Sequence, residues 1–280
     1  MKKNIFVLTS LMLTLGCGCD SFLDETNYSD VTSEGGYYDT EAGLNAVVNA
    51  CYTTLRFWAG KEDAIGLSET GTDIIAAGSG CVDNNMAAYT QSLDGTNSAC
   101  TFYFDRFYAA INWCNTAIFH AQTVPNPSND EILATTLNKR EAEARVLRTF
   151  YYWILTETFG DTYYTDQPST SIVMNPVKTS TDNIYQYMFD DLDWAIKSKL
   201  STLQNDGGRV TIWTAKALKA RLLLTRASEK NDVDMYGQAY DLAKDVIENG
   251  PFELAEDFAS IWDMKNSDGN SNKEVIWYVD

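Results

Sequence analysis

The chain is poor in the residues that build most catalytic centres. It has a single histidine, His120, among 280 residues. The sequence therefore supports no histidine-based triad, no zinc set and no two-histidine iron site. No glycine-rich phosphate-binding motif follows a predicted strand. These absences count against a hydrolase, a metalloenzyme and a nucleotide-dependent enzyme, and we expect neither a cofactor, a metal nor a catalytic residue.

Basic side chains are scarce as well. The chain has 21 Lys and Arg residues against 39 Asp and Glu residues, a formal net charge of −18. A surface of this charge repels nucleic-acid phosphates and anionic lipid headgroups, so we expect no nucleic-acid partner and no basic membrane-binding patch. Proline is rare, at 5 residues, and no stretch is linker-like or of low complexity. The chain is long enough for one large core or two small ones.

The chain has no apolar run long enough to cross a bilayer, which takes about 20 residues. Its longest apolar run is Ile5–Leu15, only 11 residues, between Lys2-Lys3 and two cysteines that each follow a glycine. This layout is typical of a bacterial lipoprotein signal, so we expect residues 1–18 to be a signal peptide. The chain would then act outside the cytoplasm, tethered by a lipid. The alternative is an ordinary secretory signal with incidental cysteines.

Either Cys17 or Cys19 could carry the lipid, and neither has the usual leucine three residues upstream. Cleavage before Cys19 would leave 19 basic and 39 acidic side chains, a formal charge of −20.

Four cysteines follow residue 19. Cys51 and Cys114 fall on apolar stripes of predicted helices and are interpreted as core residues. Cys81 and Cys100 lie in a loop-rich stretch, and an exported protein can form disulfides. We predict that they pair, which would stabilise the fold by roughly 3 kcal/mol. Two free thiols are the alternative.

The apolar periodicity predicts an all-α fold. Six helices are expected: Leu44–Leu55 with Asp39 or Thr40 as its cap, Phe104–Ile118, a long helix from a Ser128 capping box to Gly160, Ile184–Ile196, Thr211 to about Ala227, and Tyr236–Ile247, ending at Gly250. The only strand-like run is Glu274–Val279, at the C-terminal end. Residues 211–250 have the span of a tetratricopeptide helix pair, so the expected scaffold is a tetratricopeptide-like helical repeat with long irregular loops.

Residues 58–101 break this periodicity. They contain six glycines among Asp, Asn, Ser and Thr residues. An irregular segment of this length is usually functional or disordered.

Several motifs, in order, resemble those of the SusD/RagB family. Residues 139–153 read K-R-E-A-E-A-R-V-L-R-T-F-Y-Y-W, followed by Phe159-Gly160-Asp161; the family pattern is R-A-E-A-x-F-L-R-A-x-Y-Y, then F-G-D. Shorter matches are Cys19–Asp24 to C-x-x-F-L-D, residues 190–195 to D-L-x-x-A, residues 215–224, residues 243–254 and residues 274–277. The set covers nearly the whole chain. The spacing to Phe22-Leu23-Asp24 favours Cys19 as the lipidated residue.

The resemblance implies an outer-membrane lipoprotein of a glycan-uptake system, built on tetratricopeptide-like helices. Such proteins capture oligosaccharides, as in starch utilisation, for a SusC-like TonB-dependent transporter, and are not enzymes. Family members are roughly twice as long, so residues 19–280 are expected to be an N-terminal domain that is incomplete at its C-terminus. A proline usual after F-G-D is replaced by Thr162, so the turn there is expected to differ.

The resemblance supplies the ligand class, and the irregular segment supplies candidate residues. Aromatic rings stack on the C–H faces of sugars, and planar polar groups hydrogen-bond their hydroxyls. Among the residues of these types in the segment, the candidates are Trp58, Asp73, Asn84, Asn85 and Tyr89. We predict that they bind an oligosaccharide.

Two other functions remain open: a lipid-anchored scaffold that binds a protein or peptide, and a surface hydrolase. A hydrolase could use Glu141 and Glu143, but residues two apart on a helix face different sides. We expect an ion pair between Glu141 and Arg145 instead.

Overall fold

The computed structural model describes residues 36–59, 62–76, 78, 87–204, 207–266 and 272–279. The chain divides into two units, Met1–Tyr37 and Tyr38–Asp280. The fold below is that of the second unit. The predicted signal peptide, Cys17 and Cys19 lie outside the described residues, so these predictions stay untested.

The second unit is helical, which confirms the predicted all-α class. Its helices are α2 (Glu41–Thr53), α3 (Leu55–Ala59), α4 (Glu62–Glu69), α6 (Ser98–Thr123), α7 (Glu131–Phe159), α8 (Thr181–Ile196), α9 (Ile212–Lys230) and α10 (Val233–Asn249). Short 3-10 turns are η2 (Tyr37–Asp39), η3 (Phe258–Trp262) and η4 (Met264–Asn266), and the strands are β1 (Thr162–Tyr163) and β2 (Lys178–Thr179). No helix in the described part is long and apolar enough to cross a membrane.

Side-chain caps set where the helices begin. Thr40 accepts a hydrogen bond from the Gly43 amide at 3.0 Å, and Thr211 caps α9, both as predicted. The predicted Ser128 capping box is wrong. Asp130 caps α7 instead, because its carboxylate accepts from the amides of Ile132 and Leu133 at 2.8 and 3.3 Å.

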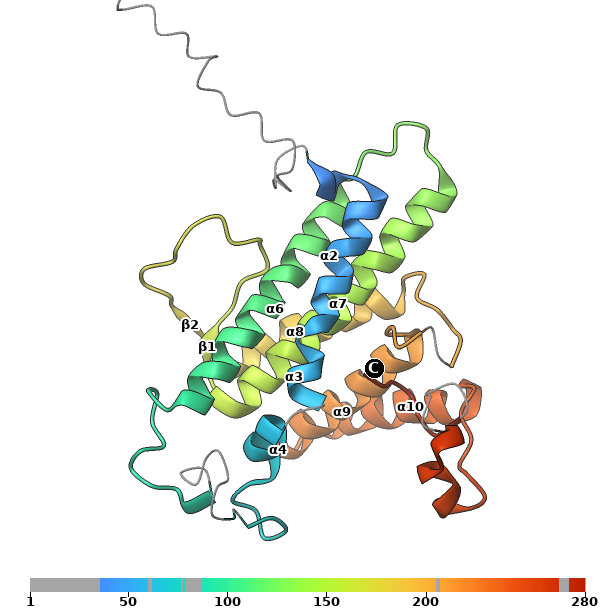
Figure 1. Ribbon diagram of the computed structural model, residues 1–280. Coiled ribbons are helices and arrows are strands. Elements are labelled where there is room, and N and C mark those ends of the chain that lie inside the picture. Colours follow the sequence, from blue (N-terminus) through green and yellow to red (C-terminus); the bar gives the residue numbers. More distant parts are fainter. Residues whose placement is uncertain are drawn as a thin grey trace, which may run out of the picture. The chain divides into compact units, whose positions relative to one another are not determined.

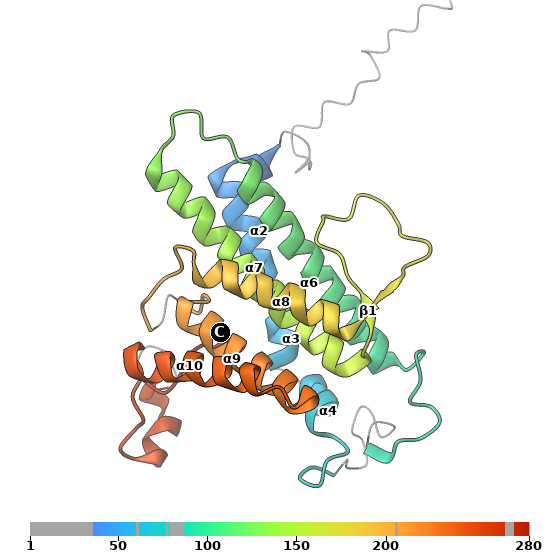
Figure 2. The same cartoon turned by 180° about the vertical axis from the view of Figure 1, so that it is seen from behind.

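The main core lies between α2, α6, α7 and α8. Figure 1 shows α2, α6 and α7 side by side, and Figure 2 shows α8 along the other side of α7. Cys51 and Cys114 are fully buried in this core, which confirms their interpretation as core residues. The Tyr151 hydroxyl donates to the Cys51 carbonyl oxygen at 2.5 Å and so links α7 to α2.

Helices α9 and α10 form the predicted pair. They pack along each other and run across the direction of α6 and α7 (Figures 1 and 2). Ala215, Ala220 and Ala239 are buried between elements, as close helix packing requires. Tyr240 and Ile247, also assigned to the apolar pattern of the last helix, are exposed on the outer face of α10 instead.

Two expectations about local structure are wrong. The segment 274–279 forms no strand: the Trp277 indole donates to the Gly208 carbonyl at 2.9 Å, and its ring packs edge-on against Phe150. The partial burial of this apolar run therefore comes from contacts with α7 and with the turn at Gly208, not from a sheet. The strands lie instead at β1 and β2, which pair antiparallel with Thr162 opposite Thr179. In addition, the predicted irregular segment contains helix α4, and α6 begins within its end.

Candidate functional site

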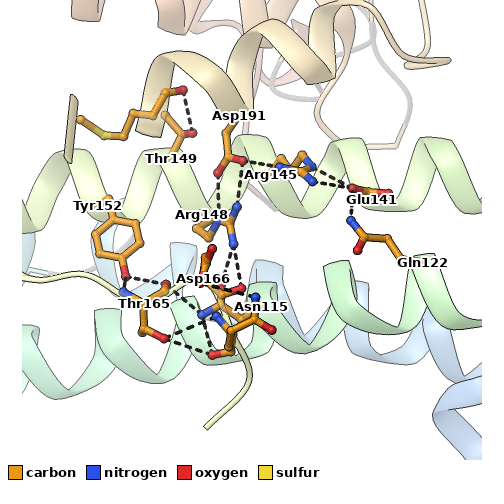
Figure 3. A network of polar contacts seen from close by, with 12 residues as sticks. Asn115, Gln122, Glu141, Arg145, Arg148, Thr149, Tyr152, Thr165, Asp166 and Asp191 are labelled. Atoms are coloured by element: carbon orange, nitrogen blue, oxygen red, sulfur yellow. Dashed lines mark hydrogen bonds and ion pairs between the residues drawn. The ribbon is translucent and has the colours of Figure 1, made fainter. Parts of the chain in front are cut away.

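A frame of buried charges on α7 positions the candidate site. Arg148 is almost fully buried and bonds Asp191 of α8 through two nitrogens, both at 2.8 Å (Figure 3). It also donates to Asn115 of α6 at 2.8 Å. Burial lowers the pKa of Arg148, but the negative charge of Asp191 and the hydrogen bonds to it raise the pKa by more. The net pKa is raised, so the guanidinium stays charged. One arginine thus joins three helices.

The same network accounts for Glu141. Arg145 binds Glu141 at 2.7 Å and Asp191 at 2.6 Å, which confirms the predicted ion pair (Figure 3). The Gln122 amide donates to Glu141 at 2.8 Å.

Glu143 belongs to a separate cluster. It is fully buried, accepts from the Tyr52 hydroxyl at 2.9 Å, and pairs with Arg209 at 2.6 Å and with Arg140. The two glutamates therefore point into different clusters, as their spacing predicts, and each is neutralised by arginine. They form a structural frame rather than a pair of carboxylates facing one cleft.

A cavity of about 790 Å³ lies at the end of this frame where α7 terminates. Six parts of the chain line it: α3, the end of α4, the segment before α6, the first turn of α6, the last two turns of α7, and α9. Its lining residues are Trp58, Leu67, Ser68, Glu69, Thr70, Tyr89, Leu93, Cys100, Trp153, Ile154, Glu157, Thr158, Phe159 and Arg221. Two of the predicted ligand residues, Trp58 and Tyr89, are therefore brought to one cavity.

Trp58 combines a core contact with an open edge. Its ring is half-buried and packs against Tyr103 and Phe107 of α6, with centroids 6.4 and 5.9 Å apart. These contacts hold the indole in one orientation, and its remaining edge lines the cavity. A ring fixed in this way loses little conformational entropy on binding.

Tyr89 is the opposite case. Its side chain is 72% exposed, and its backbone has a φ of 48°, which is uncommon outside glycine, asparagine and aspartate. Tyr89 thus offers an accessible aromatic face at the cavity rim.

The cavity contains functional groups that the sequence interpretation missed. Trp153 of α7 lines the wall, and the Arg221 guanidinium of α9 lies 5.0 Å from the centroid of its ring. Glu157 accepts a hydrogen bond from the Tyr185 hydroxyl at 2.5 Å; burial and this carboxylate raise the pKa of Tyr185. Glu69 adds a second carboxylate. Aromatic faces and planar charged groups are thus combined, as polyhydroxylated ligands require.

A third predicted site residue, Asp73, is not among the residues that line this cavity. Asp73 is exposed and lines a separate hollow of about 490 Å³ together with residues 74–76 and Ala87 and Ala88. Asn84, Asn85 and Cys81 lie outside the described residues, so the predicted disulfide of Cys81 with Cys100 stays a prediction.

His120 is a core residue. It is buried, and its Nδ1 lies 2.8 Å from a carboxylate oxygen of Asp39. Within the ranges that the structure describes, no group of three His, Cys, Asp or Glu side chains could hold a metal ion.

Comparison with known proteins gives a consistent result. Residues 71–276 match the model of the SusD-like family described as "Starch-binding associating with outer membrane". A SusD-like protein of Bacteroides ovatus is 27% identical over 291 residues, covering 99% of this chain and 49% of the relative. The chain spans about half the length of the curated relatives it matches.

Solved structures with this fold include surface glycan-binding protein A from Bacteroides fluxus, with a TM-score of 0.65 and 24% identity over 81% of this chain and 48% of that one. A crystal structure with a xylogluco-oligosaccharide gives a TM-score of 0.67 and 23% identity over 84% of this chain and 46% of that one. At these identities the likeness establishes the fold.

Proposed function

Because the chain belongs to the SusD-like family, described as starch-binding and associated with the outer membrane, we propose that it captures oligosaccharides at the bacterial surface. In this proposal it binds the glycan without cleaving it and delivers it to a SusC-like TonB-dependent transporter. Lipidation at Cys19, with Cys17 as the alternative, would hold it at the outer membrane. Residues 1–18 would be the signal peptide, and residues 19–280 would belong to a SusD-like N-terminal domain.

The observation that supports this proposal most is the cavity at the end of α7. Trp58, Tyr89 and Trp153 approach it from three different parts of the chain. Sugar rings bind to aromatic faces through their C–H groups, while the carboxylates of Glu69 and Glu157 and the guanidinium of Arg221 can bond hydroxyls. The buried frame around Arg148 supports this wall on a rigid helix, which favours a preformed site.

We propose a neutral glycan as the ligand. The chain carries a net charge of −18, and the cavity is lined by two carboxylates and one guanidinium. A polyanionic glycan would be repelled by the net negative charge of the chain and by the carboxylates of the cavity. Affinities in the micromolar to millimolar range are expected, about −8 to −4 kcal/mol, because each sugar hydroxyl exchanges water for protein at little net gain.

Calorimetry with a panel of neutral and acidic glycans tests the proposal. Trp58→Ala and Tyr89→Ala should each weaken binding by ~1 kcal/mol or more if the ring stacks on sugar. The matched control is Tyr240→Ala, an exposed tyrosine on α10 that should leave affinity unchanged. Binding that survives in both cavity variants would place the site elsewhere.

The alternative function, a scaffold that binds a protein or peptide, has one observation in its favour. Val233, Tyr240 and Ile247 are exposed along one side of α10, which leaves an apolar stripe at helical spacing. Gel-shift electrophoresis in polysaccharide separates the two functions, because only a glycan-binding protein is retarded.

A further inference from the structure

We infer that the ligand is an extended oligosaccharide that occupies two cavities, one on each side of the turn Phe159-Gly160-Asp161. The inference rests on the proposed glycan-binding function and adds the length of the ligand. It also assigns a role to the Phe159-Gly160-Asp161 motif, of which only Phe159 lines the first cavity.

A second cavity, of about 430 Å³, adjoins the first. Its lining residues are Gly95, Cys100, Thr101, Phe104, Phe159, Asp161, Thr162, Tyr163, Pro176 and Lys178. Phe159 and Cys100 line both cavities, so these two side chains form the boundary between them. A chain-like ligand that leaves the first cavity past Phe159 therefore enters the second.

The backbone of Gly160 creates this arrangement. Phe159 is the last residue of α7, and Gly160 follows with φ 69° and ψ −137°. Residues with a side chain rarely adopt this conformation. The chain therefore reverses sharply after the helix, which leaves Phe159 between the cavities while Asp161 to Tyr163 line the second one only.

The second cavity repeats the chemistry of the first. Phe104 is 38% exposed, and its ring packs edge-on against Phe159 with centroids 5.5 Å apart. Tyr163 of β1 stands opposite Lys178 of β2, and both line the cavity. The sheet thus presents an aromatic ring beside an ammonium donor, a combination suited to a sugar ring and its hydroxyls.

Asp161 supplies an ordered acceptor. One of its carboxylate oxygens accepts from the Thr181 amide at 2.8 Å and from the Thr181 hydroxyl at 3.0 Å. These hydrogen bonds lower the pKa of Asp161, so it is ionised at neutral pH. The carboxylate is held at the start of α8 and lines the cavity without needing to reorganise.

Two cavities that share Phe159 and Cys100 lead to a prediction about ligand length. A short oligosaccharide can fill one cavity, whereas a longer one gains contacts in the second without a second loss of translational freedom. Affinity should therefore rise with the number of sugar units until both cavities are filled, and then level off. Substitutions in the second cavity should therefore weaken the binding of the longer ligands and leave the binding of the shortest ones unchanged.

The test is calorimetry on the whole chain with three oligosaccharide ladders: maltose to maltoheptaose, cellobiose to cellohexaose, and xylobiose to xylohexaose. The variants are Phe104→Ala and Lys178→Ala in the second cavity, with Tyr240→Ala as the exposed control. In a ladder that binds, wild type should gain at least tenfold from the shortest to the longest member. Both second-cavity variants should lose most of that gain and keep their affinity for the shortest member.

Three outcomes count against the inference, and they are distinct. An affinity independent of length overturns it while the proposed glycan binding stands. A gain with length that persists in both second-cavity variants also overturns it, since the extra contacts then lie elsewhere. If no ladder binds to wild type, the proposed function fails as well. Circular dichroism of each variant shows whether an affinity loss reflects unfolding; Lys178→Ala, on an exposed side chain, keeps the test valid if Phe104→Ala unfolds.

Discussion

At the scale of single residues, most charged side chains of the α7 signature stabilise the fold. Glu143 and Arg148 are buried and make several bonds each to other elements. A charge in the core is tolerated only when it is paired and hydrogen-bonded. The charged residues of the signature therefore specify how α7 meets its neighbours. The candidate ligand residues are mainly aromatic and come from several elements, with Trp153 of the signature among them.

Glu143→Ala should destabilise the protein strongly. The substitution leaves Arg140, Arg209 and the Tyr52 hydroxyl without their shared acceptor, at an expected cost of about 3–5 kcal/mol. Urea denaturation measures the free energy of unfolding. The control is Lys273→Ala, which removes an exposed ion pair with Glu253 and should cost less than about 1 kcal/mol. Equal effects in the two variants would contradict the account.

The thiols of Cys51 and Cys114 should resist alkylation in the folded protein. Both are fully buried. Burial raises the pKa of Cys51 well above its ordinary value, and the adjacent Cys114 raises the pKa of Cys51 further. Since the thiolate is the reactive form, raising the pH to ~9 should not restore reactivity. Mass spectrometry after iodoacetamide treatment should show both modified only in denaturant. Rapid modification under native conditions would show that this core opens.

At the scale of elements, α7 organises the molecule. It contacts α2, α6, α8 and α9, and its C-terminal end forms part of both cavities. Its length is limited by Gly160, whose positive φ ends the helix. The position of the cavities thus depends on where one helix stops.

Gly160→Ala and Gly237→Ala form a matched pair of substitutions. A Cβ added at either glycine meets no atom within 4 Å, so only the backbone conformation differs. Gly160 has a φ of +69°, and alanine there should cost about 1–3 kcal/mol. Gly237 lies within α10, where alanine should stabilise by about 0.5–1 kcal/mol. Thermal denaturation should therefore shift in opposite directions, and shifts of the same sign would disprove this reading of the turn.

At the scale of the whole molecule, tyrosine is a major component of the core. Burial raises the pKa of Tyr52, Tyr151 and Tyr152, and it raises the pKa of Tyr164 to about 12. The folded state therefore keeps phenolic protons that the unfolded chain releases near pH ~10. The free energy of unfolding of the whole domain therefore depends on pH in the alkaline range.

Stability should fall as the pH rises above ~10. The unfolded state then binds fewer protons than the folded state, so the free energy of unfolding decreases with pH until the buried tyrosines ionise. Urea midpoints at about pH 9 and about pH 11 measure the effect, and absorbance near 295 nm, roughly the phenolate band, should show late ionisation of the folded protein. A midpoint independent of pH in this range would mean that these hydroxyls titrate normally.

Local patterns in the sequence were sufficient for the class of fold and for several helix ends. Thr40, Thr211 and Gly160 act as predicted because capping depends on a few neighbouring residues. Periodicity likewise identified the core positions of Cys51 and Cys114, since a helix buries residues three and four apart together.

What tertiary structure alone decided was which distant residues meet. Trp153 and Arg221 come together from α7 and α9, beside Trp58 of α3, and no local pattern encodes such a contact. The apolar run at 274–279 was misjudged for the same reason, because a short apolar run does not show whether it pairs in a sheet or packs against helices and turns. Helix propensity acts over one or two turns of chain, whereas a binding cavity forms from packing between elements far apart in sequence.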